Sequence, residues 1–188
     1  MADLTPFNTV GPFFKLLVRD RPEGTDCLVV EATRGEPITI RGVLLDGQGK
    51  PVDDGLVEIW QADGNGHYRH PDDPDTDHAD PAFGGFGRAA TARGGLFTFR
   101  TIKPGAVRGP DGQRQAPHIL VSVMARGVMA RCWTRLYFAG EPLNESDQIL
   151  RMVPAGRRDT LIARPMPDGA YQFNIVLQGE RETVFLDA

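Results

Sequence analysis

The stretch Leu56-Val57-Glu58-Ile59-Trp60-Gln61 is followed, after one alanine, by Asp63-Gly64-Asn65-Gly66. β-Branched and aromatic residues favour extended backbone, whereas clustered Asp, Asn and Gly favour turns, so this stretch predicts a strand that ends at a turn. Similar short apolar runs recur at residues 38–45, 96–100, 119–124, 132–138, 171–177 and 183–186. Seven or eight short strands predict an all-β fold, a sandwich of two mainly antiparallel sheets with long loops.

Helix signals are few. Residues 146–153 predict two helical turns before Pro154, and Asp159 predicts a capped turn through residues 160–163. We expect these to be the one or two short helices of a single domain spanning residues 1–188. Residues 1–14 contain Phe7, Phe13 and Phe14 and are too apolar for a solvated tail, so they are predicted to form an N-terminal arm that contacts a partner chain.

Composition excludes several classes of function. Among the 188 residues 24% are charged, and the formal net charge of -4 gives no basic field for nucleic acid. No apolar run approaches the ~20 residues that span a bilayer, and the N-terminus does not resemble a signal peptide, so we expect a cytoplasmic protein without a membrane contact. Cys27 and Cys132 form no CxxC pair; two free thiols are favoured, and a disulfide between them stays open.

Two regions carry residues suited to chemistry. The loop at residues 70–86 is rich in aspartate, and His67, His70 and His78 lie in or beside it; such a cluster either binds a divalent metal or is an ordinary acidic surface loop. His118 opens a predicted strand, where a histidine is either a packed core residue or a ligand. The glycine-rich residues 83–88 have no strand before them and no helix after them, which argues against a phosphate loop.

Several blocks taken together resemble the intradiol ring-cleavage dioxygenases. They are Thr9-Val10-Gly11-Pro12-Phe13, Val57-Glu58-Ile59-Trp60-Gln61-Ala62, Gly66-His67-Tyr68-Arg69-His70, Thr101-Ile102-Lys103-Pro104-Gly105, Ala116-Pro117-His118-Ile119, Arg135-Leu136-Tyr137-Phe138 and residues 171–179. They follow one another in order over nearly the whole chain. In that family two tyrosines and two histidines hold a ferric ion, and dioxygen cleaves a bound catechol between its hydroxylated carbons. Phenolates are hard anionic donors, which suits Fe(III).

Matched by position, the chain keeps only half of that ligand set. Tyr68 and His118 stand at the first tyrosine and first histidine, whereas Val107 and Leu120 stand at the second of each. Gln115 replaces the family's arginine before the Ala-His pair. Valine and leucine have no donor atoms, so the resemblance implies a lapsed site, with no metal and no catalytic residue in this chain alone.

Within the family, the chain resembles the alpha chains of members that pair homologous alpha and beta chains. The resemblance implies a hetero-oligomer of alpha–beta pairs, with Fe(III) on the partner beta chain and not on this chain. It also implies that Thr9, Gly11, Pro12 and Arg126 form part of the pocket wall for a carboxylated catechol, which reacts there with dioxygen.

Two alternatives stay open at this point. In one, the chain is a self-sufficient dioxygenase whose metal is bound by Tyr68, His118 and donors from the aspartate-rich loop: Asp72, Asp73, Asp75, Asp77 and Asp80. In the other, it is a non-enzymatic, transthyretin-like sandwich that binds a ligand or a partner.

Overall fold

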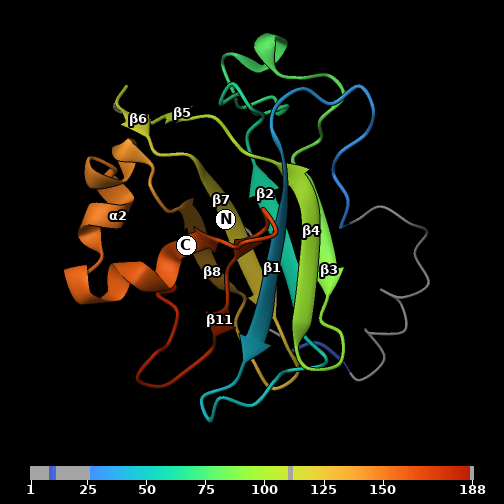
Figure 1. Ribbon diagram of the computed structural model, residues 1–188, viewed down its shortest axis with the longest axis vertical. Coiled ribbons are helices and arrows are strands. Elements are labelled where there is room, and N and C mark those ends of the chain that lie inside the picture. Colours follow the sequence, from blue (N-terminus) through green and yellow to red (C-terminus); the bar gives the residue numbers. More distant parts are fainter. Residues whose placement is uncertain (1–8, 12–25, 110–111, 187–188) are drawn as a thin grey trace, which may run out of the picture.

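Two β-sheets pack face to face in the computed structural model, which describes residues 9–11, 26–109 and 112–186 (Figure 1). One sheet has the order β3-β2-β7-β8, and the other is built on β1, which pairs with β4, β10 and β11. The bounds are β1 Pro37–Leu45, β2 Leu56–Gln61, β3 Phe86–Ala90, β4 Leu96–Ile102, β7 His118–Met124, β8 Cys132–Phe138, β10 Tyr171–Gln172 and β11 Ile175–Val176. The predicted all-β sandwich is confirmed.

The longer strand pairs are antiparallel, and one short strand joins the two sheets. β1 with β4, β2 with β3, β2 with β7 and β7 with β8 all run antiparallel, whereas β1 pairs in parallel with β10 and β11. β9 (Ile162–Pro165) pairs with both β8 and β10, so the sandwich is closed along that edge into a near-barrel.

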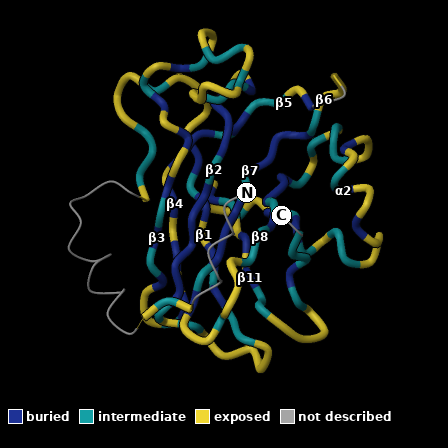
Figure 2. Tube along the Cα trace, turned by 180° about the vertical axis from the view of Figure 1, so that it is seen from behind, coloured by how far each residue is buried: buried dark blue, intermediate teal, exposed yellow. Residues whose placement is uncertain are grey.

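The core lies between the sheets, and its residues alternate along the strands. In β1 the side chains of Ile38, Ile40 and Leu44 are buried, as the period of two predicts for a strand with one face inward. β2 is buried on both faces: on its outer face Glu58 is only 6% exposed and accepts a hydrogen bond from Arg88 Nε at 2.7 Å. Figure 2 shows the buried stretches following the strands, with the exposed residues mainly in the loops.

The predicted strand at residues 171–177 is split where it crosses β1. Phe173 turns its side chain into the core, and Asn174 Oδ1 accepts the backbone N–H of Val43 at 3.1 Å in place of a strand partner. β10 and β11 therefore pair with β1 on either side of this break. Gly42 of β1 lies at the crossing, where a Cβ would be 1.9 Å from the Phe173 carbonyl oxygen.

Other predictions were wrong in identifiable ways. Residues 183–186 form only a single bridge, between Leu186 and Trp133. The turn expected at residues 160–163 does not exist: η3 (Ala155–Leu161) contains Asp159, and Ile162 already belongs to β9, where it pairs with Tyr137 of β8. β3 was missed because its start lies in the glycine-rich stretch. The two-residue strands β5 (Val107–Arg108) and β6 (Arg114–Gln115) were also missed.

The short helix predicted at residues 146–153 is confirmed as α2 (Gln148–Met152), whose N-cap Asp147 accepts the backbone N–H of Leu150. Two other single turns are 3₁₀ helices, η1 (Thr76–His78) and η2 (Pro142–Glu145). Cys27 and Cys132 are both free thiols. Over the described ranges, every helix lacks the length and apolar character needed to cross a membrane.

Gly42→Ala should destabilise the fold by about 3 kcal/mol, because the new methyl group would overlap the Phe173 carbonyl and the Phe97 ring. Gly156→Ala is the matched control, since a Cβ there meets nothing within 4 Å. Urea unfolding measures both. Equal stabilities of the two variants would show that β1 and the β10–β11 break are not packed in this way.

Candidate functional site

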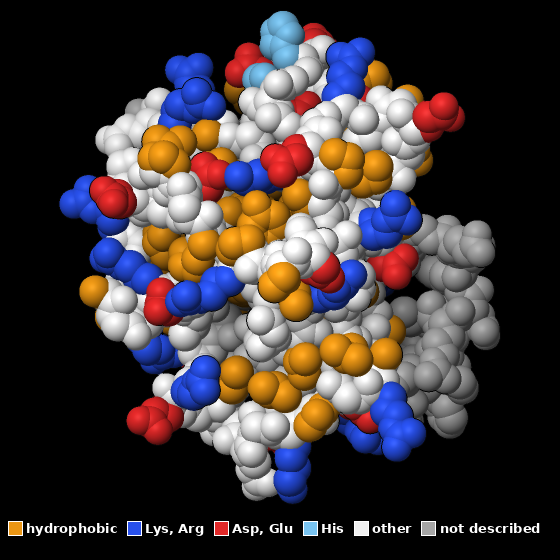
Figure 3. Space-filling view, in the orientation of Figure 1, with side chains coloured by type: hydrophobic (Ala, Val, Ile, Leu, Met, Phe, Trp, Pro, Cys, Tyr) orange, Lys and Arg blue, Asp and Glu red, His pale blue; other side chains and the backbone are white. Residues whose placement is uncertain are grey.

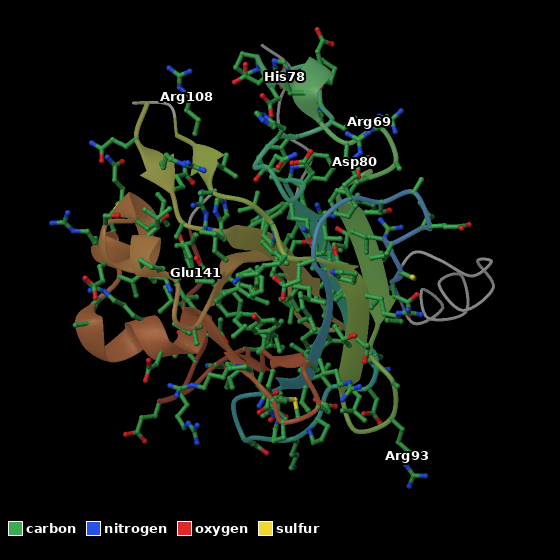
Figure 4. The ribbon with its side chains drawn as sticks, turned by 45° about the horizontal axis from the view of Figure 1, so that its top comes forward. Arg69, His78, Asp80, Arg93, Arg108 and Glu141 are labelled. Carbon is green, nitrogen blue, oxygen red and sulfur yellow. The ribbon has the colours of Figure 1, made fainter. Side chains whose placement is uncertain are left out.

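The predicted site residues fall into two groups at opposite ends of β7. Tyr68, Val107, His118 and Leu120 lie toward the start of β7, and Thr9 and Arg126 lie beyond its end; Gly11 is close to Thr9 in the chain, and Pro12 lies outside the described residues. At the first end Figure 4 shows Arg69, His78, Asp80 and Arg108, with Arg93 at the other end of the molecule. Histidine side chains also gather at the first end in Figure 3.

Tyr68 is held by ring stacking and by its own backbone. Its ring stacks on Trp60, with centroids 5.7 Å apart and planes 18° from parallel. Its backbone N–H donates to Asp73 Oδ2 at 2.6 Å, which ties the tyrosine to the aspartate-rich loop. Burial raises the pKa of the Tyr68 phenol, and the opposing charge of Arg135 has a smaller effect. The phenol is therefore neutral at physiological pH.

His118 is buried, and only one of its ring nitrogens is engaged. Nδ1 lies 2.7 Å from the Ala116 carbonyl oxygen, which can only accept, so Nδ1 carries the hydrogen and Nε2 is left as the free acceptor. A backbone carbonyl that fixes one nitrogen in this way is common behind metal-binding histidines. Burial, and next the charge of Arg135, lower the pKa of His118 to about 4.

The two residues that the resemblance sets at the remaining ligand positions, Val107 and Leu120, have only hydrocarbon side chains. Val107 lies in β5, where it pairs with Gln115 of β6. Leu120 stands in the middle of a row across the sheet, between Trp60 of β2 and Arg135 of β8. Residues paired across antiparallel strands project from the same face, so these three side chains share the outer face with His118, two residues before Leu120.

A cavity of about 880 Å³ opens at this end of the sandwich. Its lining residues include Trp60, Tyr68 and Val107, together with cations and carboxylates on its rim: Arg108, Arg114, Asp72, Asp73 and Asp75. Ligand atoms of His67, Asp73 and Asp75 lie within 4.8 Å of one another. His118 is not in that group of described residues.

The carboxylates of the aspartate-rich loop are largely used by the loop itself. Asp73 accepts the backbone N–H of both Tyr68 and Asp75. Asp80 is buried and accepts the backbone N–H groups of Arg34 and Ala82; the bond from Arg34 is the largest cause that lowers the pKa of Asp80. These aspartates therefore shape the loop around the cavity.

At the other end, Thr9 and Arg126 are brought together. The Thr9 hydroxyl donates to the Ala125 carbonyl at 3.2 Å and accepts a hydrogen bond from the Gly127 backbone N–H at 2.8 Å. It therefore fixes the N-terminal segment to the turn that carries Arg126. Arg126 is 66% exposed and forms an ion pair with Asp54 at 2.8 Å. Arg126, Asp54 and residues of the same turn line a second cavity, of about 800 Å³. Gly11 is exposed.

Sequence reasoning missed two residues of these sites. Asp54 lies in the turn before β2, and nothing in the sequence connects it with Arg126. Arg135 lies on β8; it donates to Gln115 Oε1 at 2.8 Å and to the Tyr137 hydroxyl at 3.4 Å. The one available sequence signal for Arg135 was Gln115. It stands where the family has an arginine, so a positive charge is lost there without an identified replacement.

Comparison with known proteins places the chain among dioxygenases. A model of a dioxygenase family matches residues 11–179. The chain is 39% identical over 197 residues to the protocatechuate 3,4-dioxygenase alpha chain of Pseudomonas putida, covering 97% of this chain and 96% of that one.

The chain belongs to the intradiol ring-cleavage dioxygenase family. It is also 40% identical over 159 residues to a protocatechuate 3,4-dioxygenase beta chain of Burkholderia cepacia, covering 79% of this chain and 67% of that one. Among solved structures, the dioxygenase domain of a carbohydrate-binding fusion from Streptomyces sp. SirexAA-E has a TM-score of 0.62 at 32% identity, and the match covers 94% of this chain and 99% of that domain.

Intradiol dioxygenases normally use iron, and the residues of this chain do not fit a ferric ion. Of the four ligand positions, only Tyr68 and His118 have a donor atom. We therefore assign no chemical step to a metal at this end of the chain.

His118 should make stability depend on pH. Folded His118 stays neutral down to about pH 4, whereas an unfolded histidine takes up a proton near pH 6.5. The unfolded state binds more protons between these values, so the free energy of unfolding should fall by up to about 3 kcal/mol as the pH drops across this window.

Urea unfolding across this pH window measures the effect. His118→Leu should remove this part of the slope, whereas His70→Leu, which removes an exposed histidine, should keep it because His118 is still present. An unchanged slope in His118→Leu would contradict the assignment.

Proposed function

We propose that the chain is the iron-free alpha subunit of a protocatechuate 3,4-dioxygenase. In this proposal a homologous beta chain carries the Fe(III) and cleaves 3,4-dihydroxybenzoate with dioxygen between its hydroxylated carbons, giving 3-carboxy-cis,cis-muconate. The observation that carries the proposal is the hydrocarbon at two of four ligand positions, Val107 and Leu120, in a chain similar over its whole length to alpha chains. The chain and its partner would form a hetero-oligomer of alpha–beta pairs.

In this proposal the Thr9–Arg126 end of the chain forms part of the wall of the partner's pocket. The two hydrogen bonds of Thr9 to the turn at residues 125–127 support this role, because they hold the N-terminal segment beside the exposed guanidinium of Arg126. Arg126 would then attract the substrate carboxylate, with Thr9, Gly11 and Pro12 as the adjoining wall. Asp54 holds the Arg126 side chain in place through their ion pair, and Arg126 would then contact both Asp54 and the substrate carboxylate.

The N-terminal arm is part of the same proposal. Residues 1–14 lie outside the described residues except for 9–11, and we propose that they form an arm that contacts the partner chain, for which their phenylalanines are suited. The remainder of residues 1–188 would form a single domain.

A self-sufficient dioxygenase is the second candidate. Its support is the group of His67, Asp73 and Asp75, which lies beside Tyr68 in the larger cavity. Against it, Asp73 already accepts two backbone N–H groups, and His118 is absent from the group. The third candidate, a non-enzymatic sandwich that binds a ligand or a partner, is supported only by the fold.

Co-expression with a homologous beta chain that has both tyrosines and the HxH pair tests the proposal. The complex should cleave 3,4-dihydroxybenzoate, and Tyr68→Phe or His118→Gln in this chain should change kcat by less than about 2-fold, because these residues contact no substrate. A self-sufficient enzyme would instead lose about 100-fold or more with either variant. Inactivity of the assembled wild-type complex would contradict the proposal, and activity without a beta chain would favour the second candidate.

Arg126→Ala should raise the KM of the complex for 3,4-dihydroxybenzoate by about 10-fold, because a charge-assisted contact to the carboxylate is lost. Catechol, which has no carboxylate, should be affected much less. Arg164→Ala is the matched control, since Arg164 is also 66% exposed and also pairs with one aspartate. Equal changes in KM for the two variants, or for the two substrates, would show that Arg126 is not part of the pocket wall.

A further inference from the structure

Arg135 connects all three positions at which the ligand region departs from the family's pattern. Val107 pairs with Gln115 across β5 and β6, and Gln115 Oε1 accepts a hydrogen bond from Arg135 Nη1 at 2.8 Å. Leu120 is the direct partner of Arg135 across β7 and β8. The position of the lost arginine therefore contacts the guanidinium directly, and the positions of the two lost ligands are the strand partners of Gln115 and of Arg135 itself.

A buried hydrogen-bond network holds Arg135 in place. Its Nη1 lies 3.4 Å from the Tyr137 hydroxyl, and that hydroxyl donates to Asp147 Oδ1 at 2.9 Å. Asp147 also accepts the backbone N–H groups of Ala116 and Leu150, so it is fixed between the start of β7 and the first turn of α2. Tyr137 and Asp147 are almost fully buried, and the carboxylate of Asp147 supplies a negative charge on the far side of Tyr137.

Arg135 is also linked to both donors that the chain retains. His118 pairs with Tyr137 across β7 and β8, with ring centroids 5.8 Å apart, and the Tyr137 hydroxyl lies 3.4 Å from Arg135 Nη1. Tyr68 stacks on Trp60, which pairs with Leu120, the cross-strand partner of Arg135. A fixed positive charge beside the ligand positions opposes the binding of a metal cation there, because like charges repel.

We propose that Arg135 has replaced the metal as the cation of this site, and that it keeps the site closed to metal ions even when the missing ligands are supplied. The proposal rests on the family's ligand positions and not on assembly with a partner chain. It also accounts for Gln115: a second arginine there would put two guanidinium groups in contact, whereas an amide oxygen accepts a hydrogen bond from Arg135.

The test restores the ligands in this chain alone. Val107→Tyr/Leu120→His should bind little ferric iron, whereas the same variant with Arg135→Gln should bind about one ferric ion per chain and show tyrosinate-to-iron absorption. Arg93→Gln in place of Arg135→Gln is the control, since Arg93 is exposed at the opposite end (Figure 4). Each protein is loaded with Fe(II), oxidised in air, desalted and analysed for metal.

Two results would overturn the proposal: equal iron binding with and without Arg135, or no binding by the folded Arg135→Gln variant. Circular dichroism shows which variants fold. If the tyrosine-containing variants do not fold, Leu120→His alone gives a second imidazole on the same face as His118, whose Nε2 is free.

For that pair, calorimetric titration with Zn(II) should show at least ~10-fold tighter binding when Arg135→Gln is added. Equal affinities would overturn the proposal. The iron analysis and the zinc titration use this chain alone and involve no ring cleavage. A negative result in them therefore does not bear on the proposed function, and a negative result for the proposed function does not bear on the role of Arg135.

Discussion

The antiparallel pairing of β7 with β2 on one side and β8 on the other is the constraint on which the rest of the structure depends. It turns Ile119, Val121 and Val123 into the core between the sheets. By the same alternation it turns His118 and Leu120 to the outer face, in register with Trp60 and Arg135. A slip of one residue would exchange these two sets, so the core and the site are fixed by one register.

The length of β7 also separates the two groups of predicted site residues. At its start lie Tyr68, Val107, His118 and Leu120, the predicted remnant of a ligand set. Beyond its end lies Arg126, held beside Thr9 and Asp54. In the proposed function this chain binds no iron, and the second end would still act, because a pocket wall needs shape and charge but no metal. A partner chain with a complete ligand set would supply the metal.

The sequence was informative where the signal is local. Apolar runs bounded by turns predicted the long strands, and the apolar spacing at residues 146–153 predicted the short helix α2. The break at Phe173 and Asn174 could not be predicted, because it depends on the close approach of Gly42, 131 residues away in the chain. β3 was hidden by the glycines at its start; the one inside it, Gly87, is needed because Leu28 and Ile59 leave no room there for a Cβ. For the site, family positions gave Tyr68, Val107, His118 and Leu120. Asp54 emerges only from tertiary contacts, and Arg135 had no sequence signal beyond the replacement at Gln115.

The central claim is that the chemistry belongs to a partner chain, and metal analysis of the complex from the native host tests it most directly. The complex is purified, its two chains are separated under conditions that retain bound metal, and ferric iron is measured on each. The account predicts that iron and its tyrosinate absorption follow the homologous chain and that this chain is colourless. Stoichiometric ferric iron with a tyrosinate absorption band on this chain alone would contradict it.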